Sequence, residues 1–284
     1  MNLLELLLLF VLLICTSGLI LLCYMRYEAG TLTIERIDLS EAATALTTNN
    51  LRAVQFSDIH IPHLKISTKK IIAALNEIQP HIVLLTGDYI EKVKDMDRFL
   101  LWLKVLIDSQ PSQTAFYLCF GNHDYFACKK KSAALHQFIK RLKSIGVFVL
   151  ENHSELYSHN GKKYAITGFR DLRCSPLNIS GALRSIDPTA NYRIGLAHNP
   201  DTVLMLQNGI IDLLLCGHFH GGQIWLPFHL EFTCLRPEKL CKMKIYHGLH
   251  LINGIKLYIS RGIGCVLFPL RFRSKPEITF FTLP

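Results

Sequence analysis

The chain has no cysteine pair with the spacing of a zinc ribbon, and it has fewer acidic than basic residues. Nine cysteines are an odd number, and none of them forms a C-x-x-C pair. This pattern argues against a zinc ribbon and against a secreted disulfide framework. Asp and Glu number 22 against 31 Lys and Arg, so the formal net charge is +9. An excess of this size raises the question of an anionic partner.

The basic residues gather in clusters for which three explanations stay open. The clusters lie at 129–131, 140–143, 239–244 and 271–275. They can bind a nucleic acid, contact an anionic membrane surface, or form an ordinary solvated face. No aromatic residues are interleaved with them as in a stacking platform, so we expect no nucleic-acid partner. The membrane surface is favoured because the chain also carries a membrane-length apolar segment.

Basic residues are missing from the N-terminus, where Leu3 to Met25 is almost continuously apolar. As a helix this run spans roughly 35 Å, enough to cross a bilayer. The alternative is a cleaved signal peptide. No Lys or Arg precedes the run, it is longer than a signal core, and no Ala-x-Ala site follows it. We therefore expect a transmembrane anchor over residues 1–25.

The residues after the anchor predict its orientation and the domain boundaries. Arg26 and Arg36 follow the apolar run, and the positive-inside tendency places the rest of the chain in the cytoplasm. Residues 26–50 show no strong periodicity and are interpreted as a tether. Residues 51–284 then form the folded domain.

Strand-like and helix-like segments alternate in the first half of this domain. Helices are expected at 67–79, 95–108 and 132–144. Buried strands are expected at 51–57, 81–86 and 114–120, with shorter ones at 147–150, 164–169, 192–197 and 210–216. This alternation predicts an α/β layered domain.

Five blocks of polar residues each begin where an apolar, strand-like run ends. They are Asp58-Ile59-His60, Gly87-Asp88, Gly121-Asn122-His123-Asp124, Ala197-His198-Asn199 and Gly217-His218-Phe219-His220. Together they supply carboxylate oxygen, amide oxygen and imidazole nitrogen, which are donors for a divalent cation. Open α/β sheets place their sites at the carboxyl ends of strands. The blocks therefore predict a two-metal centre, a kind of site that hydrolyses phosphate esters.

The spacing within the blocks suggests how the side chains converge. Asp58 and His60 are two positions apart, and an extended backbone would aim both toward the same side. The pair His218 and His220 repeats this spacing. Gly87 would let the chain turn tightly and bring Asp88 inward.

The blocks D-x-H, G-D, G-N-H-D, H and G-H-x-H resemble the calcineurin-like metallophosphoesterase superfamily, over residues 51–284. The resemblance implies a four-layer αββα sandwich with two divalent metal ions. Its implied ligands are Asp58, His60, Asp88 and His220 for one ion, and Asp88, Asn122, His198 and His218 for the other. His123 would act on the leaving-group oxygen, and Asp124 would orient its ring.

Mn²⁺ is the first choice of metal, with Fe, Zn and Mg as alternatives. Phe219 stands where Thr is common, and we expect little effect from it.

Further segments resemble a narrower branch, the membrane-anchored bacterial phosphodiesterases that include UDP-2,3-diacylglucosamine pyrophosphatases of lipid A synthesis. These segments are 197–201, 217–224, 260–264 and 276–278. The resemblance implies an anionic lipid-linked phosphate substrate and a place in the bacterial inner membrane. A broad-specificity phosphodiesterase or a nucleotide hydrolase remains an alternative. A non-catalytic scaffold is disfavoured because no donor residue is lost.

Two apolar runs, 224–228 and 266–270, are unusual for a soluble enzyme. They can be core packing. They can also form a wall for acyl chains or a surface that dips into the bilayer, with Arg271 and Arg273 at the headgroups.

Overall fold

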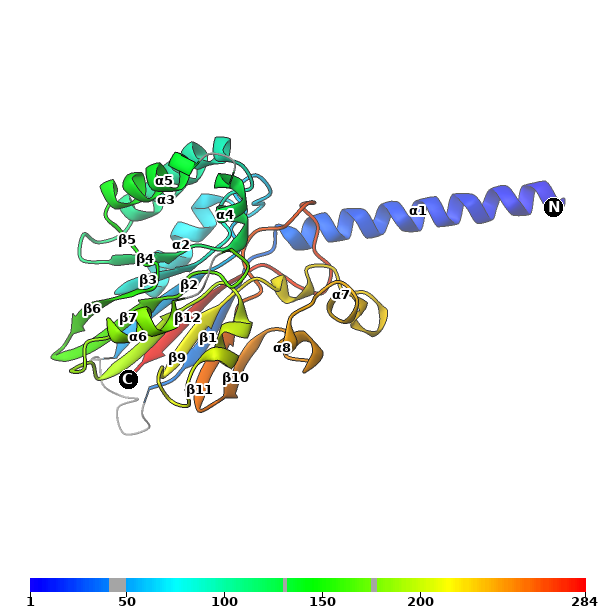
Figure 1. Ribbon diagram of the computed structural model, residues 1–284. Helices are drawn as coiled ribbons and strands as arrows, with labels where there is room; N and C mark the ends of the chain where they lie inside the picture. Colours follow the sequence, from blue (N-terminus) through cyan, green and yellow to red (C-terminus); the bar gives the residue numbers. More distant parts are fainter. Residues whose placement is uncertain (41–49, 130–131, 175–177) are drawn as a thin grey trace.

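The computed structural model describes residues 1–40, 50–129, 132–174 and 178–284, and in this part of the chain two six-stranded sheets form the core (Figure 1). The first sheet has the order β1 (Thr33–Asp38), β12 (Glu277–Leu283), β2 (Leu51–Phe56), β3 (Ile82–Thr86), β4 (Ala115–Cys119) and β5 (Val147–Val149). The second has the order β10 (Gly248–Ile252), β11 (Ile255–Ile259), β9 (Leu213–Cys216), β8 (Tyr192–Leu196), β7 (Lys162–Gly168) and β6 (His153–His159).

Parallel pairing brings the ends of the central strands to one edge of each sheet. β2, β3, β4 and β5 are successive parallel neighbours in the first sheet. β7, β8, β9 and β11 are parallel neighbours in the second. The loops that follow β2, β3, β4, β8 and β9 therefore leave from carboxyl ends, where α/β sheets place their sites.

Helices cover the outer face of each sheet, so the domain has four layers. α2 (Thr68–Ile78), α3 (Met96–Asp108) and α5 (Ser132–Ser144) pack their apolar faces on the first sheet. The second sheet is covered by the shorter α6 (Ile179–Arg184), η2 (Pro200–Met205) and α8 (Lys239–Lys242). Side chains such as Leu84, Tyr117, Leu196 and Leu215 fill the space between the sheets. The predicted αββα arrangement is confirmed.

A single long helix, α1 (Leu3–Ala29), projects from the domain (Figure 1). Asn2 caps its first turn together with Glu5. It is the one helix in the described part of the chain that is long and apolar enough to span a membrane, with a mean hydropathy of 3.0, and this stretch is unburied. The helix continues past Met25, and Met25, Glu28 and Ala29 on one side of its end are buried.

The interpretation of residues 26–50 as a tether is wrong for much of that segment. Residues 26–29 complete α1, and Thr33–Asp38 forms β1, which pairs in parallel with β12. The pairing partner lies at the other end of the chain, so no local pattern marks this edge strand. Residues 41–49 lie outside the described residues, as do positions 130 and 131 of one basic cluster.

The base of α1 is attached to the segment that precedes β12. The Arg271 amide donates to the Met25 carbonyl at 3.1 Å, and the Ser274 amide donates to Glu28 Oε1 at 2.8 Å. Tyr24 and Phe272 meet edge to face, with ring centroids 6.1 Å apart. The membrane-length helix is therefore joined directly to a loop of the domain.

Candidate metal centre

Six of the seven predicted donor residues form two neighbouring clusters at the carboxyl ends of strands from both sheets, and the seventh, Asn122, lies directly before His123, whose amide contacts Asp88. Asp58 and His60 follow β2, Asp88 follows β3, and Asn122 begins α4 (Asn122–Cys128) just after β4. His198 follows β8, whereas His218 and His220 follow β9. Each of the seven is at most 4% exposed. Residues distant in the sequence are thus brought together between the two sheets.

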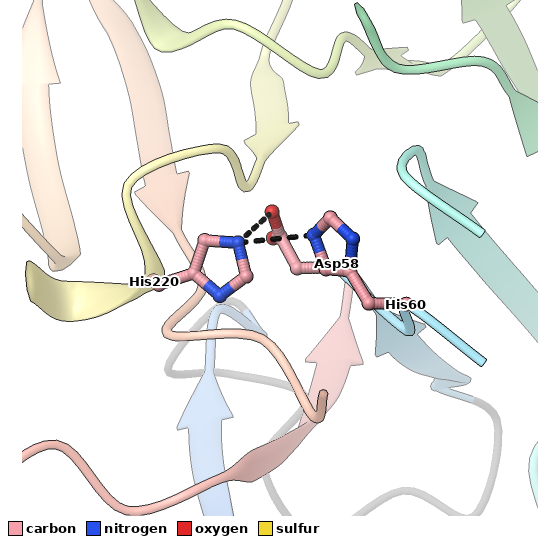
Figure 2. A group of neighbouring side chains, drawn as sticks. All are labelled: Asp58, His60 and His220. Carbon is pink, nitrogen blue, oxygen red and sulfur yellow. Dashed lines mark hydrogen bonds and ion pairs between the residues drawn. The ribbon is translucent and has the colours of Figure 1, made fainter. Parts of the chain in front are cut away.

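The first donor cluster consists of Asp58, His60 and His220. Figure 2 shows both imidazoles turned toward the carboxylate of Asp58. His220 Nε2 lies 3.2 Å from Asp58 Oδ1 and 3.1 Å from His60 Nε2. Two nitrogens and one oxygen thus face a common point.

The second cluster consists of Asp88, His198 and His218. His198 Nε2 lies 3.0 Å from Asp88 Oδ2 and 3.1 Å from His218 Nδ1. Asp88 Oδ2 is also 3.8 Å from His60 Nε2 in the first cluster. Asp88 therefore stands between the two clusters, where one carboxylate can serve both.

Asn122 has an unpaired side-chain oxygen, and the amide of the next residue, His123, donates to Asp88 Oδ1 at 2.8 Å. Asn122 is 2% exposed, and its side-chain Oδ1 has no hydrogen-bond partner among the described residues. A buried oxygen left without a partner costs roughly 1–3 kcal/mol. A divalent cation would remove that cost, and imidazole, carboxylate and amide donors suit such an ion. The residues present therefore fit a pair of divalent metal ions.

The backbone at the donor residues is strained. Positive φ angles occur at Asp58 (51°), His60 (39°), Asp88 (59°), His218 (73°) and His220 (53°). A non-glycine residue in such a sparsely populated region costs on the order of 1–3 kcal/mol. The predicted extended geometry at these i, i+2 pairs is wrong, because β2 ends at Phe56 and β9 ends at Cys216. The side chains converge through left-handed turns.

Two glycines allow the loops to come this close. Gly87 has a φ of +96°, and a Cβ atom there would stand 2.6 Å from His198 Nδ1 and 2.7 Å from the Gly121 amide nitrogen. A Cβ at Gly121 would collide with the carboxylate of Asp88. The expected tight turn at Gly87 is present, and only glycine fits it.

The charges of the site balance one another through buried pairs. Burial opposes ionisation of Asp88, but His198, His123 and His60 hold its pKa well below its usual range. Burial likewise disfavours the charged form of His198, yet Asp88 raises its pKa to about 10. Burial lowers the pKa of His218 to about 3. Asp88 is thus held as a carboxylate anion by the imidazoles that surround it.

The role expected for Asp124 is wrong. Its carboxylate accepts hydrogen bonds from the backbone amides of Asp88, Tyr89, Ile90 and Gly121, at 2.8–3.1 Å. Both oxygens are used in this way, so Asp124 fixes the two loops and does not orient the ring of His123.

Glu91 orients His123 instead. Its Oε2 lies 2.8 Å from His123 Nδ1, and its Oε1 lies 2.5 Å from His60 Nδ1. Burial opposes ionisation of Glu91, but His123 and His60 lower its pKa to about 2. The His123 amide also donates to Asp88 Oδ1 at 2.8 Å, and its side chain is 30% exposed at the edge of the site.

Sequence reasoning missed the groups that hold the outer nitrogens of the imidazoles. Besides Glu91, these are Glu238 Oε1, 2.9 Å from His218 Nε2, and the Thr86 carbonyl, 2.9 Å from His198 Nδ1. Such partners fix the orientation of ligand imidazoles. Glu91, three residues after Asp88, could have been suspected from its nearness to a block. Nothing in the sequence pattern marks Glu238.

Arg271 does not lie at a membrane surface, contrary to one expectation. It is fully buried, and its guanidinium donates to carbonyls of Arg261, Gly262, Gly264, Ser274 and His220. Arg273 remains exposed. Arg271 therefore anchors the loops around the site, and of these two arginines Arg273 is the exposed one.

Comparison with known proteins agrees with this geometry. Residues 51–222 match the family described as calcineurin-like phosphoesterase. The metallophosphoesterase YkoQ of Bacillus subtilis is 30% identical over 232 residues, covering 81% of this chain and 82% of that protein. Phosphodiesterase YaeI of Escherichia coli is 31% identical over 212 residues, covering 73% and 72%.

A third relative carries a more specific name. The UDP-2,3-diacylglucosamine pyrophosphatase LpxG of Chlamydia trachomatis is 26% identical over 280 residues, covering 81% of this chain and 82% of that protein. The family and the donor clusters together imply divalent metal ions. The chain belongs to the calcineurin-like phosphoesterase family and is a metal-dependent phosphohydrolase.

Proposed function

We propose that the chain is a dinuclear-metal phosphodiesterase or pyrophosphatase that acts on a lipid-linked substrate. Asp58, His60, Asp88 and His220 would hold one ion, and Asp88, Asn122, His198 and His218 the other. The observation that carries this proposal is the position of Asp88 between two donor clusters. Mn²⁺ is proposed as the metal because the donors mix oxygen and nitrogen.

A bound metal pair supplies charge neutralisation and an activated water for in-line attack on phosphorus. The chain's own residues position the substrate and handle a proton. His123 is the catalytic residue in this proposal. Because Glu91 holds its Nδ1, its Nε2 is the nitrogen that can give a proton to the leaving-group oxygen. General acids of this kind typically contribute about 10²–10⁴-fold to the rate.

The apolar runs support a lipid-linked substrate. Leu226, Phe228, Leu267 and Phe268 are exposed, and several of them line a groove that begins at His220. Exposed apolar side chains gathered around a site indicate a lipid or protein contact. The relative LpxG is named for UDP-2,3-diacylglucosamine. We propose the same class of substrate here, cleaved to 2,3-diacylglucosamine 1-phosphate and UMP.

The helix α1 supports membrane attachment of the enzyme. We propose that it crosses the bacterial inner membrane once and that the domain faces the cytoplasm. Arg26 and Arg36 follow the apolar run, and the positive-inside tendency favours this orientation. Since the base of α1 is bonded to the 271–274 segment, the site would stay close to the bilayer.

The test compares two substrates with detergent-solubilised, Mn²⁺-loaded protein. UDP-2,3-diacylglucosamine should be cleaved far more efficiently than bis(4-nitrophenyl) phosphate, since each buried CH₂ contributes roughly 0.8 kcal/mol. Phe268→Ser should reduce this preference. Leu101→Ser, which changes an exposed residue of α3 away from the site, should not.

Equal turnover of both compounds would instead favour a broad-specificity phosphodiesterase, in keeping with the relative YaeI. Absence of hydrolysis of either compound in metal-replete protein would contradict the proposal.

A further inference from the structure

A groove of about 320 Å³ connects the donor clusters with an exposed apolar rim. His220 lies at its inner end. Its outer walls include Leu226, Leu235, Leu267 and Phe268, which are 40%, 72%, 74% and 64% exposed. The groove is therefore polar and buried at one end, and apolar and open at the other. An anionic amphiphile likewise has a polar end and an apolar end.

Arg236 is the one cation among the residues that line this groove. Its guanidinium carbon lies 5.6 Å from the centroid of the Phe219 ring. Phe219 is fully buried, and its ring centroid lies 5.7 Å from that of His218, so the guanidinium is held near the second donor cluster. The side chain of Arg236 is partly buried, and burial lowers its pKa.

The guanidinium of Arg236 lacks an acceptor. Among the residues the structure describes, no hydrogen bond or ion pair is formed by Arg236, although arginine carries five N–H donors. The nearby carboxylates contact other groups, although the buried Oε2 of Glu238 has no hydrogen-bond partner among the described residues. Glu238 pairs with His218 and Arg173, and Glu231 accepts from the Leu226 amide and contacts His229. A partly buried guanidinium with free donors is suited to an external anion.

We propose that Arg236 binds the phosphoryl oxygens of the substrate, while the apolar part of the same molecule lies along the groove. An arginine fork matches the geometry of phosphate oxygens. The identity of the anion as a phosphoryl group rests on the proposed function. Arg236 is thus a substrate-binding residue that selects phosphate esters with an apolar tail.

Phe219 has a part in this arrangement that its sequence context did not suggest. A cation over an aromatic ring is stabilised by roughly 0.5–1 kcal/mol at exposed sites and by more when desolvated. The aromatic ring between the two histidines thus acts as a platform for Arg236. Phe219 is a positioning residue, and we expect a smaller effect from its replacement than from that of Arg236.

The test measures binding, so that it does not depend on hydrolysis. The full-length, Mn²⁺-loaded protein in detergent is titrated calorimetrically with hexyl phosphate and with inorganic phosphate. Arg236→Ala should weaken binding of both ligands by about tenfold or more, the scale of a charged hydrogen bond. Arg236→Lys should recover part of the loss, and Phe219→Leu should weaken binding about threefold.

Two further variants test the groove and the specificity of the effect. Leu267→Ser should weaken binding of hexyl phosphate and leave that of inorganic phosphate unchanged. Arg98→Ala, which removes an exposed arginine of α3, should change neither. Bound metal and the thermal unfolding midpoint are measured for every variant and should match the wild type.

The outcomes separate this inference from the proposed function. Unchanged phosphate binding in Arg236→Ala, loss of metal in that variant, or absence of binding in the wild type would overturn the role of Arg236. Arg236-dependent binding in a protein that hydrolyses no phosphodiester would support the role of Arg236 and contradict the proposed function. If Arg236→Ala does not fold, Arg236→Lys decides: full wild-type affinity for both ligands would contradict a contact that needs the arginine fork.

Discussion

Glu91 and Asp124 differ in role although both are acidic and lie beside the same blocks. Glu91 bonds two imidazoles, at 2.5 and 2.8 Å. Asp124 bonds four backbone amides and no imidazole. The first contact set orients side chains, whereas the second holds loops together.

This difference predicts opposite effects of two substitutions. Glu91→Gln should lower kcat about 10- to 100-fold, the usual scale for a partner of a ligand imidazole, and leave stability nearly unchanged. Asp124→Ala leaves four backbone amides without an acceptor and should destabilise the fold by roughly 3 kcal/mol or more. Steady-state kinetics and thermal unfolding of both variants check this. An Asp124→Ala protein with wild-type stability and a lowered kcat would instead support a role of Asp124 in orienting the His123 ring.

At the scale of elements, the junction of α1 with the domain is the feature that links the membrane segment to the site. Glu28 is buried, and its Oε1 accepts from the Ser274 amide. Ser274 Oγ in turn donates to the His220 carbonyl at 2.7 Å. A continuous set of hydrogen bonds thus runs from the helix to a donor residue.

Glu28→Ala should loosen this junction. The Ser274 amide would lose its acceptor, at a cost of roughly 1–3 kcal/mol. We expect faster proteolysis within 266–275 and a lower unfolding midpoint for the detergent-solubilised protein. Glu77→Ala, which removes an exposed ion pair of α2 with Arg36, serves as the matched control and should behave like the wild type. Equal protease resistance of Glu28→Ala and the control would contradict the linkage.

The two sheets also meet at a histidine pair before β3 and at the end of β6. The rings of His81 and His159 lie 4.0 Å apart, and His81 Nδ1 accepts from the Arg52 amide at 3.0 Å. Burial, together with His159 and Arg52, lowers the pKa of His81 to about 4. The pair is therefore neutral in the folded protein near neutral pH.

This depressed pKa predicts a loss of stability in acid. An unfolded histidine titrates near 6.5, so between about pH 6.5 and 4 the unfolded chain binds more protons than the folded chain. Stability contributed by neutral His81 is complete above this range and declines as the pH falls through it. His81→Gln should show a smaller drop in unfolding midpoint between pH 7 and 4.5 than the wild type, and parallel drops in both proteins would refute the assignment.

At the scale of the whole molecule, the sequence predicted the four layers and the convergence of the donor residues. It did not predict the edge strand β1 or the backbone conformation at the donor residues. Buried apolar runs ending in polar blocks predict the strands β2, β3, β4, β8 and β9 and the loops after them. β1 was missed because its partner β12 is at the other end of the chain. The left-handed turns at the donors were missed because tertiary contacts impose them on residues that do not prefer them.

The sequence did not predict the hydrogen-bond partners of the imidazoles, for a related reason. Glu238 reaches His218 from a separate loop, and Arg236 reaches Phe219 in the same way. Neither has a spacing or motif that relates it to a donor block. Such contacts depend on how loops of the second sheet fold over the site.

The whole-molecule proposal of a cytoplasmic domain can be tested with the chain's own cysteines. Cys234 is exposed on the domain, whereas Cys15 and Cys23 lie in α1. A membrane-impermeant maleimide should leave Cys234 unlabelled in intact spheroplasts and label it after lysis. Cys234→Ser identifies the labelled site, and labelling of Cys234 in sealed spheroplasts would show that the domain faces outward.

The central claim is that two divalent ions share the carboxylate of Asp88, and metal content per chain tests it most directly. Purified, Mn²⁺-reconstituted protein should contain two ions per chain by plasma mass spectrometry, and Asp88→Ala should lose bound metal together with activity, because both clusters lose a donor. His123→Ala should retain both ions and lose only rate. A wild-type protein that binds no more than one ion, or an Asp88→Ala protein that keeps two ions and near wild-type turnover, would contradict the account.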